Sequence, residues 1–181
     1  MKRFLTPVLL ASSLLLGACA TRDVPFQPAV QAVADQPFTA AGRLSVNVDG
    51  KGHVANFDWQ HAPERDTLSV TTPVGSTVAR LTRDAAGVTL DADGKRRTAT
   101  DVEALTEETL GWRLPLSNLV WWIRGQTAPG LAVERLPDGS VRQEGWTIRF
   151  VSDAEAPGPY PRRVELSRDR LSMRLVVHAW Q

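Results

Sequence analysis

Histidine and cysteine, the side chains that most often do chemistry, are few and widely separated in this 181-residue sequence. Its three histidines, His53, His61 and His178, lack the spacing of metal ligands. The motifs G-x-S-x-G and H-E-x-x-H and a glycine-rich phosphate loop are also missing from the sequence. Glu107 and Glu108 are adjacent in a predicted helix and therefore diverge, which argues against an acid–base pair. We interpret the histidines as surface or strand residues and expect no catalytic residue, metal or cofactor, so the protein is not predicted to be an enzyme.

The single cysteine, Cys19, has the clearest predicted chemistry. Lys2 and Arg3 precede an apolar run, residues 4–16, that is too short for a comfortable transmembrane helix. The run ends in Leu16-Gly17-Ala18-Cys19, which resembles the lipobox of bacterial lipoproteins. This resemblance implies that residues 1–18 are a lipoprotein signal peptide, that Cys19 carries a thioether-linked diacyl group, and that the new amino terminus is acylated. The alternative is an ordinary secretory signal with an incidental cysteine.

The residues after the cysteine predict where the protein resides and how it is divided. Ala20 stands where an aspartate would resemble an inner-membrane retention signal, which favours a lipid anchor in the outer membrane, facing the periplasm. Residues 19–37 are predicted to be a lipidated tether, with a possible short helix from Ala29 to Asp35. Residues 38–181 are predicted to form one domain, which must depend on its packed core because no cysteine remains for a disulfide. Without residues 1–18 the formal charge changes from +1 to −1, so no nucleic-acid partner is expected.

From Phe38 onward, apolar and polar residues mostly alternate, a pattern typical of strands. Asp49-Gly50 and Asp93-Gly94 predict tight hairpins. The alternating apolar positions are Leu44, Val46, Val48, Ala55, Phe57, Trp59, Leu68, Val70, Ala79, Leu81, Val88 and Leu90, and later Leu131, Val133, Trp146, Ile148, Phe150, Leu171, Met173, Leu175 and Val177. Strands, then helices, then strands indicate an α+β domain in which helices pack on one face of a curved antiparallel sheet.

The stretch from Gly111 to Gly125 predicts a short, strongly apolar helix between these two groups of strands. Pro115 suits a first helical position and Gly125 suits the position just past a helix end. The stripe at helical spacing consists of Leu116, Leu119, Val120 and Ile123, with Trp122 on its flank. Such a helix must lie on other apolar residues. A second helix is predicted over residues 100–110, opened by a capping box from Thr100 to Glu103.

The loop Thr72-Pro73-Val74-Gly75-Ser76-Thr77 places an apolar residue at the tip of a predicted type I turn. A β-branched apolar residue is an unusual choice for a solvated tip. Val74 therefore either has a function there, folds back onto the end of the sheet, or is a harmless exposed side chain. Lys95-Arg96-Arg97 has two interpretations as well: a contact for acidic headgroups or an acidic partner, or a solvated strand edge protected from aggregation.

Taken in order from Phe38 to the end, several motifs together are similar to the LolB family, the outer-membrane receptor of the lipoprotein localisation pathway in Gram-negative bacteria. The most specific is Gly111-Trp112-x-Leu114-Pro115 with Leu119, Trp122 and Arg124-Gly125. The others are Gly42-Arg43-Leu44, Asn56-Phe57-x-Trp59, Pro73-Val74-Gly75-Ser76-Thr77, Gly145-Trp146 and Leu175-Val176-Val177 with Trp180. One such motif would be a weak signal, whereas the ordered set is a strong one.

The resemblance implies an open, half-closed antiparallel β-barrel with helices lidding an apolar cavity that receives the acyl chains of other lipoproteins. The residues expected to line it are Leu44, Val46, Phe57, Trp59, Leu68, Val70, Leu105, Leu116, Leu119, Trp122, Ile123, Trp146 and Ile148. A solid core would use the same residues, so that alternative stays open. Pro73, Val74 and Gly75 are expected to form a membrane-insertion loop, although the family pattern leads us to expect leucine at its tip.

The resemblance also implies partners: a LolA-like periplasmic lipoprotein carrier, acylated lipoproteins as cargo, and the inner leaflet of the outer membrane. The sequence has no visible nucleotide site, so we expect handover down an affinity gradient to a receptor that is a monomer. One alternative is a lipid-anchored envelope sensor or scaffold of the same fold, which predicts a filled or occluded cavity. Another is an anchored lipid-metabolising enzyme, which would need a polar constellation inside that cavity. A free periplasmic carrier is disfavoured by the lipobox.

Overall fold

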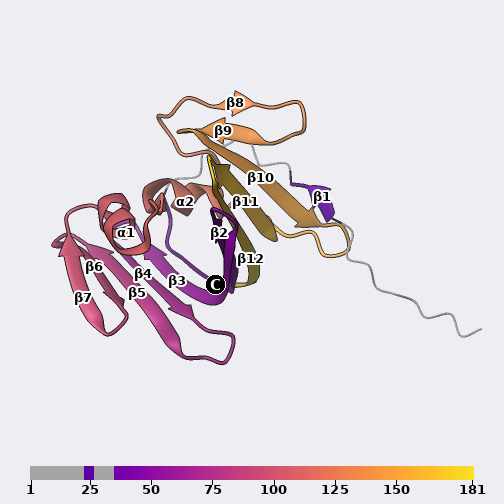
Figure 1. The fold of residues 1–181 in the computed structure, drawn as a ribbon. Coiled ribbons are helices and arrows are strands. Elements are labelled where there is room, and N and C mark those ends of the chain that lie inside the picture. The colour runs from indigo at the N-terminus through magenta and orange to yellow at the C-terminus, as the bar shows by residue number, and fades with distance from the viewer. Residues whose placement is uncertain (1–22, 27–34) are drawn as a thin grey trace, which may run out of the picture.

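The alternating segments form one strongly curved antiparallel sheet that wraps around two short helices (Figure 1). The computed structural model describes residues 23–26 and 35–181, so the predicted signal peptide, Cys19 and most of the possible helix from Ala29 to Asp35 lie outside the described residues. The strands follow one another in the order β7-β6-β5-β4-β3-β2-β12-β11-β10-β9-β8, with β1 paired to β10. Because β7 and β8 end this order without pairing to each other, the sheet is open, which confirms the predicted fold class.

The strands are β1 (Asp23–Pro25), β2 (Phe38–Val48), β3 (Lys51–Ala62), β4 (Arg65–Thr71), β5 (Thr77–Asp84), β6 (Gly87–Ala92), β7 (Lys95–Ala99), β8 (Glu134–Arg135), β9 (Val141–Gln143), β10 (Trp146–Asp153), β11 (Arg163–Arg168) and β12 (Leu171–Trp180). The helices are α1 (Val102–Leu110) and α2 (Leu116–Trp122), both between β7 and β8 in the chain. Within the described residues, neither helix is long and apolar enough to cross a membrane.

Both predicted Asp-Gly hairpins are confirmed. Asp49 and Gly50 have φ values of 51° and 82°, and Asp93 and Gly94 have values of 52° and 69°. Two consecutive positive φ values are what a type I′ turn requires, and this turn matches the twist of the strands that it joins. The turns connect β2 to β3 and β6 to β7, so they fix the register of the long strands that carry the inward-facing residues.

Helix α1 begins one residue later than its predicted capping box. Asp101, in an extended conformation, is the N-cap residue, and its carboxylate accepts a 2.7 Å hydrogen bond from the backbone N–H of Ala104. The prediction of Thr100 as the cap was therefore wrong by one position, because the carboxylate of the next residue satisfies the free N–H. Helix α1 packs against β6 and β7.

Helix α2 begins one residue later than predicted, because Pro115 has a non-helical ψ of 60° and is the N-cap residue, but it ends as its sequence predicts. Gly125 has a φ of +76° and its N–H donates to the carbonyl of Trp122, while the N–H of Gln126 donates to the carbonyl of Trp121. This pair of hydrogen bonds is the Schellman motif, which uses a left-handed residue to satisfy the last carbonyls of a helix. The helical segment therefore stops at Gly125. Arg124, the residue before it, is buried and only 4% exposed.

Two parts of the sheet differ from the prediction. Leu131 and Val133 precede β8 instead of forming a strand, and Val133 is exposed. The predicted turn after them is present, since the N–H of Gly139 donates to the carbonyl of Leu136. Within the predicted tether, Asp23–Pro25 forms β1 on the outer edge of β10, so part of the segment before residue 38 belongs to the sheet.

Candidate functional site

The residues predicted to line an acyl-chain cavity come together between the sheet and the helices. Eleven of the thirteen are buried, and the remaining two, Leu44 and Val70, are partly buried against the same cluster. They come from both arms of the curved sheet and from both helices: β2, β3, β4 and β10, together with α1 and α2. The period of two along the strands and the helical stripe of α2 thus direct their apolar side chains to one place.

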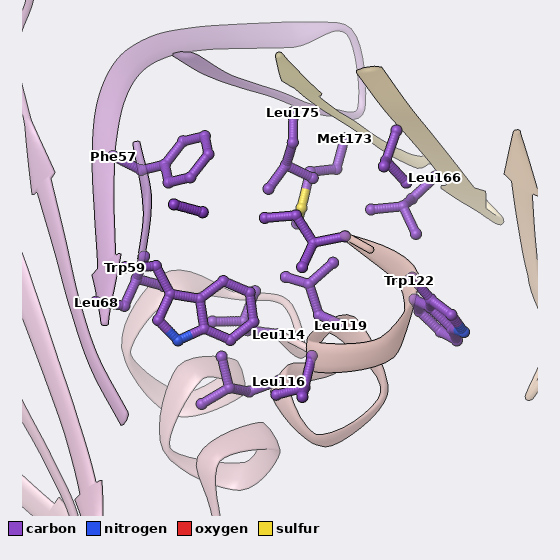
Figure 2. Packing of buried hydrophobic residues seen from close by; sticks show 14 of the residues in the cluster. Phe57, Trp59, Leu68, Leu114, Leu116, Leu119, Trp122, Leu166, Met173 and Leu175 are labelled. Carbon is purple, nitrogen blue, oxygen red and sulfur yellow. The ribbon is translucent and has the colours of Figure 1, made fainter. Parts of the chain in front are cut away.

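In this structure the side chains under α2 are packed against one another (Figure 2). Trp59, Trp122, Ile123 and Ile148 are each 0% exposed, and Leu116 and Leu119 on α2 are 1% and 2% exposed. Figure 2 shows Leu119 and Leu116 directed from α2 toward the residues of the curved sheet. The interior therefore has the composition of an acyl-chain site and the packing of a core.

One side of α2 is held by a neutral amide. Gln143 at the end of β9 is 1% exposed, and its Oε1 accepts hydrogen bonds of 2.9 Å from Trp122 Nε1 and from the backbone N–H of Ala128. Its Nε2 donates to the carbonyl of Ala128 at 2.7 Å. Because the buried amide meets both backbone groups and the indole, it fixes α2 and the following segment to β9.

The other side of the interior contains a charged cluster centred on Asp66, which is 0% exposed on β4. Its Oδ1 accepts from Trp59 Nε1 at 2.9 Å and lies 2.7 Å from His61 Nδ1. Its Oδ2 accepts from Arg83 Nε at 2.6 Å. The antiparallel register explains this meeting, since His61 is paired with Asp66 across β3 and β4, and Asp66 with Arg83 across β4 and β5.

His61 lies between two carboxylates. Its Nε2 is 2.9 Å from Asp35 Oδ1, and its side chain is 1% exposed. Burial lowers the pKa of His61, but the hydrogen bonds with Asp66 and Asp35 outweigh burial and raise the pKa above its ordinary value. Burial likewise raises the pKa of Asp66, but hydrogen bonds from His61, Trp59 and Arg83 hold that pKa below its ordinary value. The cluster therefore favours an imidazolium that donates to both carboxylates.

Asp35 connects this cluster to the end of α2. Its Oδ1 lies 3.5 Å from Arg124 Nη2, and Arg124 Nε donates to the carbonyl of Val120 at 3.0 Å. The Arg124 guanidinium carbon is 5.4 Å from the Phe38 ring centre and 5.0 Å from the Trp121 ring centre. A charge in such a position is stabilised by the faces of the rings as well as by the carboxylate.

The segment before the domain contacts the same helix end at a second point. The N–H of Phe26, which follows β1, donates to the carbonyl of Phe150, and the Phe26 ring lies against Gly125. A Cβ at Gly125 would come within 2.4 Å of Phe26 Cε1. Phe26 and Asp35 therefore both lie against the C-terminal end of α2.

The two helices are joined to each other through polar side chains. Ser117 Oγ donates to Glu103 Oε1 at 3.0 Å, and the backbone N–H of Leu114 donates to Thr106 Oγ1 at 2.9 Å. Burial raises the pKa of Glu103. A hollow of about 300 Å³ opens beside this junction, with Asp35, His61, Asp66 and Arg83 on one side and α1 and α2 on the other. Polar and apolar atoms share its lining equally, so it is not the predicted apolar cavity.

The loop predicted to reach the membrane projects from the sheet. The N–H of Gly75 donates to the carbonyl of Thr72 at 2.9 Å, and the N–H of Ser76 donates to Thr72 Oγ1 at 3.1 Å, which closes the predicted turn. Val74 is 90% exposed. The interpretation in which this valine folds back onto the sheet end is therefore wrong, because the turn directs it outward.

The three basic residues considered for headgroup contact are not equivalent. Arg96 forms a bidentate pair with Asp91, at 2.7 and 3.1 Å. Arg97 is partly buried on β7, whereas Lys95 is exposed at the start of the strand. Of the three, Lys95 is therefore the residue to which both interpretations, headgroup contact and edge protection, still apply.

The polar residues that hold the helices were not predicted from the sequence. His61 was interpreted as a surface or strand residue; it is on a strand but buried, whereas His53 and His178 are exposed. Extending the alternation Phe57, Trp59 by two residues would have placed His61 on the buried face. Gln143 offers a weaker signal, since it precedes a Glu-Gly turn on a three-residue strand.

Comparison with known proteins identifies the family of this chain. The family model described as "Outer membrane lipoprotein LolB" matches residues 36–180. The chain is 53% identical over 176 residues to the outer-membrane lipoprotein LolB of Chromobacterium violaceum, covering 96% of this chain and 97% of the relative. It is 38% identical over 173 residues to LolB of Thiobacillus denitrificans, covering 92% of this chain and 91% of the relative.

Among solved structures, a LolA superfamily protein from Nitrosomonas europaea superimposes with a TM-score of 0.47 and 10% identity, covering 82% of this chain and 87% of that chain. The matches to LolB extend over almost the whole sequence. They confirm the family that the motifs indicated and its localisation at the outer membrane. This chain belongs to the LolB family of outer-membrane lipoproteins.

Proposed function

We propose that this protein is a lipid-anchored receptor that accepts lipoproteins from a LolA-like periplasmic carrier and inserts them into the inner leaflet of the outer membrane. The anchor is the acylated Cys19. The cargo's acyl chains enter the apolar interior between α2 and the sheet, and Pro73, Val74 and Gly75 form the loop that meets the membrane. No nucleotide is hydrolysed, so transfer follows increasing affinity from carrier to receptor to bilayer.

The physical need for such a receptor follows from the size of the cargo's lipid. Three acyl chains of about sixteen carbons, at about 0.8 kcal/mol for each CH₂ group, make free passage through water cost tens of kcal/mol. The proposal rests on the apolar cluster that the described residues form under α2. Strands from both halves of the open sheet contribute to this cluster.

Because this interior is packed, acceptance of cargo requires movement. Leu116, Leu119 and Trp122 fill the space next to the sheet, so acyl chains enter only when α2 moves outward or these side chains repack. The apolar surface that α2 uncovers is then covered again by the acyl chains, which makes the exchange nearly balanced in buried area. An empty receptor is protected from water by its own side chains.

Val74→Glu tests the two halves of this function separately. A carboxylate at the tip cannot enter the hydrocarbon region, whereas the interior lies away from the loop. We expect cargo to move from the carrier to the variant as it does to the wild type, and insertion into the membrane to fall sharply. Both steps are measured in one assay, by following the cargo from carrier to receptor to vesicle. Normal insertion would remove Val74 from the mechanism, and failure to accept cargo would count against the receptor function.

One observation favours the alternative, an envelope sensor or scaffold of the same fold. That function predicts a filled interior, and the described structure has one. It also predicts that a loaded carrier keeps its cargo in the presence of this protein. The transfer assay therefore separates the two functions directly.

A further inference from the structure

The exposed apolar side chains of the described residues are unevenly placed. Val54, Val74 and Val78 are 56%, 90% and 44% exposed, and all three lie at or beside the loop between β4 and β5. The other exposed large apolar residues, Leu110 and Val133, lie elsewhere, at the end of α1 and before β8. Scattered single residues of this kind need no explanation, but three around one loop do.

The strand register places Val54 and Val78 on the two flanks of the loop. Asn56 on β3 is paired with Thr71 on β4, so Val54 lies two residues further along, beside the start of the loop. Thr71 is paired in turn with Thr77 on β5, the residue before Val78. Neighbouring strands are about 4.8 Å apart, and this register offsets Val54 from Val78 by about three residues along the strands, so the two valines are about 14 Å apart, on either side of the strand that leads into the turn of Val74.

Both flanking valines point away from the core. Along β3, Phe57 and Trp59 are buried, and residues of the other parity, including Val54 and Asp58, face outward. Along β5, Leu81 is the buried residue. The outward-facing valines and the loop tip are thus a group of exposed apolar residues around one loop, which we name the loop face: Val54, Pro73, Val74 and Val78.

Cations border the loop face. Val78 and Lys95 line the same hollow of about 770 Å³ next to the β6–β7 turn, together with Arg80 and Arg96. Of the acidic residues in this hollow, Asp91 is paired with Arg96, which leaves Asp93 beside Lys95 and Arg80. The border therefore has an excess of positive charge.

We propose that the loop face, with Lys95 at its border, is a docking surface for an anionic phospholipid bilayer, in which Val54 and Val78 enter the interface beside Val74. The inference rests on the proposed delivery to a membrane and extends it from one residue to a surface. A bilayer fits better than a protein partner because the most exposed apolar residue, Val74, stands on the tip of a projecting turn, and the bordering cations match anionic headgroups. Three small side chains then share the contact that one larger tip residue would provide.

The test uses single cysteines as position markers in the lipidated full protein. With Cys19 modified by lipid, Val54→Cys, Val74→Cys and Val78→Cys each introduce one free thiol for an environment-sensitive fluorophore. The proteins are reconstituted in vesicles of phosphatidylethanolamine with phosphatidylglycerol. Leu110→Cys and Val133→Cys are the matched controls, since they are exposed apolar positions outside the loop face.

We expect blue-shifted emission, and quenching by spin-labelled lipid, at residues 54, 74 and 78 and at neither control. A signal at residue 74 alone would overturn the wider surface and leave the receptor function standing. Cargo transfer from a loaded carrier is measured on the same unlabelled preparation, so a failure of the receptor function is seen separately.

A second measurement does not depend on a label. The double variant Val54→Ser with Val78→Ser should insert cargo about three- to tenfold more slowly, in line with the apolar area lost, while still accepting it from the carrier. Leu110→Ser with Val133→Ser serves as the control and should insert at the wild-type rate. Equal rates for the two double variants would overturn the proposal.

Discussion

The two anchors of α2 are built from different chemistry. Gln143 holds Trp122 through an uncharged amide, whereas Arg124 at the helix end is held through Asp35, His61 and Asp66. The amide anchor has no titratable group. The charged anchor includes a histidine between two carboxylates and an aspartate from the segment that leads toward the predicted lipid anchor. The contacts of Gln143 with α2 are therefore independent of pH, whereas those at Arg124 depend on pH and involve Asp35 from the N-terminal segment.

The largest effect should come from breaking the charged anchor at its centre. Asp66→Ala leaves His61, Trp59 and Arg83 without their shared acceptor, and loss of one partner from a buried charged cluster costs about 3 kcal/mol. Urea unfolding measures the change in free energy. Asp91→Ala, which removes an exposed pair with Arg96, is the control and should leave stability unchanged. Similar results for both variants would show that the cluster does not hold the fold.

Breaking the amide anchor should cost somewhat less. Gln143→Leu keeps the buried volume but leaves Trp122 Nε1 and both backbone groups of Ala128 without a partner, a loss of about 2 kcal/mol. The loss should be the same at pH 5 and pH 9, because the amide does not titrate. A loss that depended on pH would contradict the contrast between the two anchors.

A smaller effect should appear where the N-terminal segment touches the helix end. Gly125→Ala introduces a Cβ at a φ of +76° and within 2.4 Å of Phe26 Cε1, which we expect to cost about 1–2 kcal/mol. Gly130→Ala is a matched control, with a φ of +74° and nothing within 4 Å of the added Cβ. The difference between the variants in thermal unfolding measures the contact with Phe26. Equal losses would show that the contact adds nothing.

The smallest effect is a pH dependence of stability that belongs to the charged anchor. Because the pKa of His61 is raised, its contribution is complete below the unfolded value of about 6.5 and is lost as pH rises through the folded pKa. The groups that face His61 are Asp66 on β4 and Asp35 before β2, with Arg83 and Arg124 behind them.

The aspartate acts at the opposite end of the pH scale. Since the pKa of Asp66 is lowered, its contribution is present above the unfolded value of about 3.9 and is lost as pH falls through the folded pKa. Stability should therefore be greatest between these two limits. His61→Gln should remove the decline on the alkaline side, and a wild type whose stability did not fall there would contradict the assignment of an imidazolium.

The parts of the fold that were predictable from the sequence depend on local rules. Asp49-Gly50 and Gly125 specify their own backbone conformations, and the alternation along each strand identifies the inward face. The candidate interior followed from the same patterns, because an apolar stripe on α2 has to meet the apolar faces of the strands. Val74 attracted attention in the sequence because an apolar, β-branched residue is unusual at the tip of a solvated turn.

The parts that were not predictable depend on contacts between distant segments. Gln143 meets Trp122 across 21 residues, and Asp35 meets His61 across 26 residues, so neither pair has a local signature. Strand β1 has only three residues and includes Pro25, which makes it invisible to a pattern of alternation. The packing of the interior was equally undetermined, since a cavity wall and a core use the same residues.

The receptor function is tested by mixing residues 19–181 carrying Cys19→Ala with purified carrier that is loaded with a lipoprotein. A pull-down then shows which of the two proteins holds the cargo. We expect the lipoprotein to move to this protein without added nucleotide. Cargo that stays on a carrier shown to be active in parallel would contradict the receptor function and favour the sensor or scaffold.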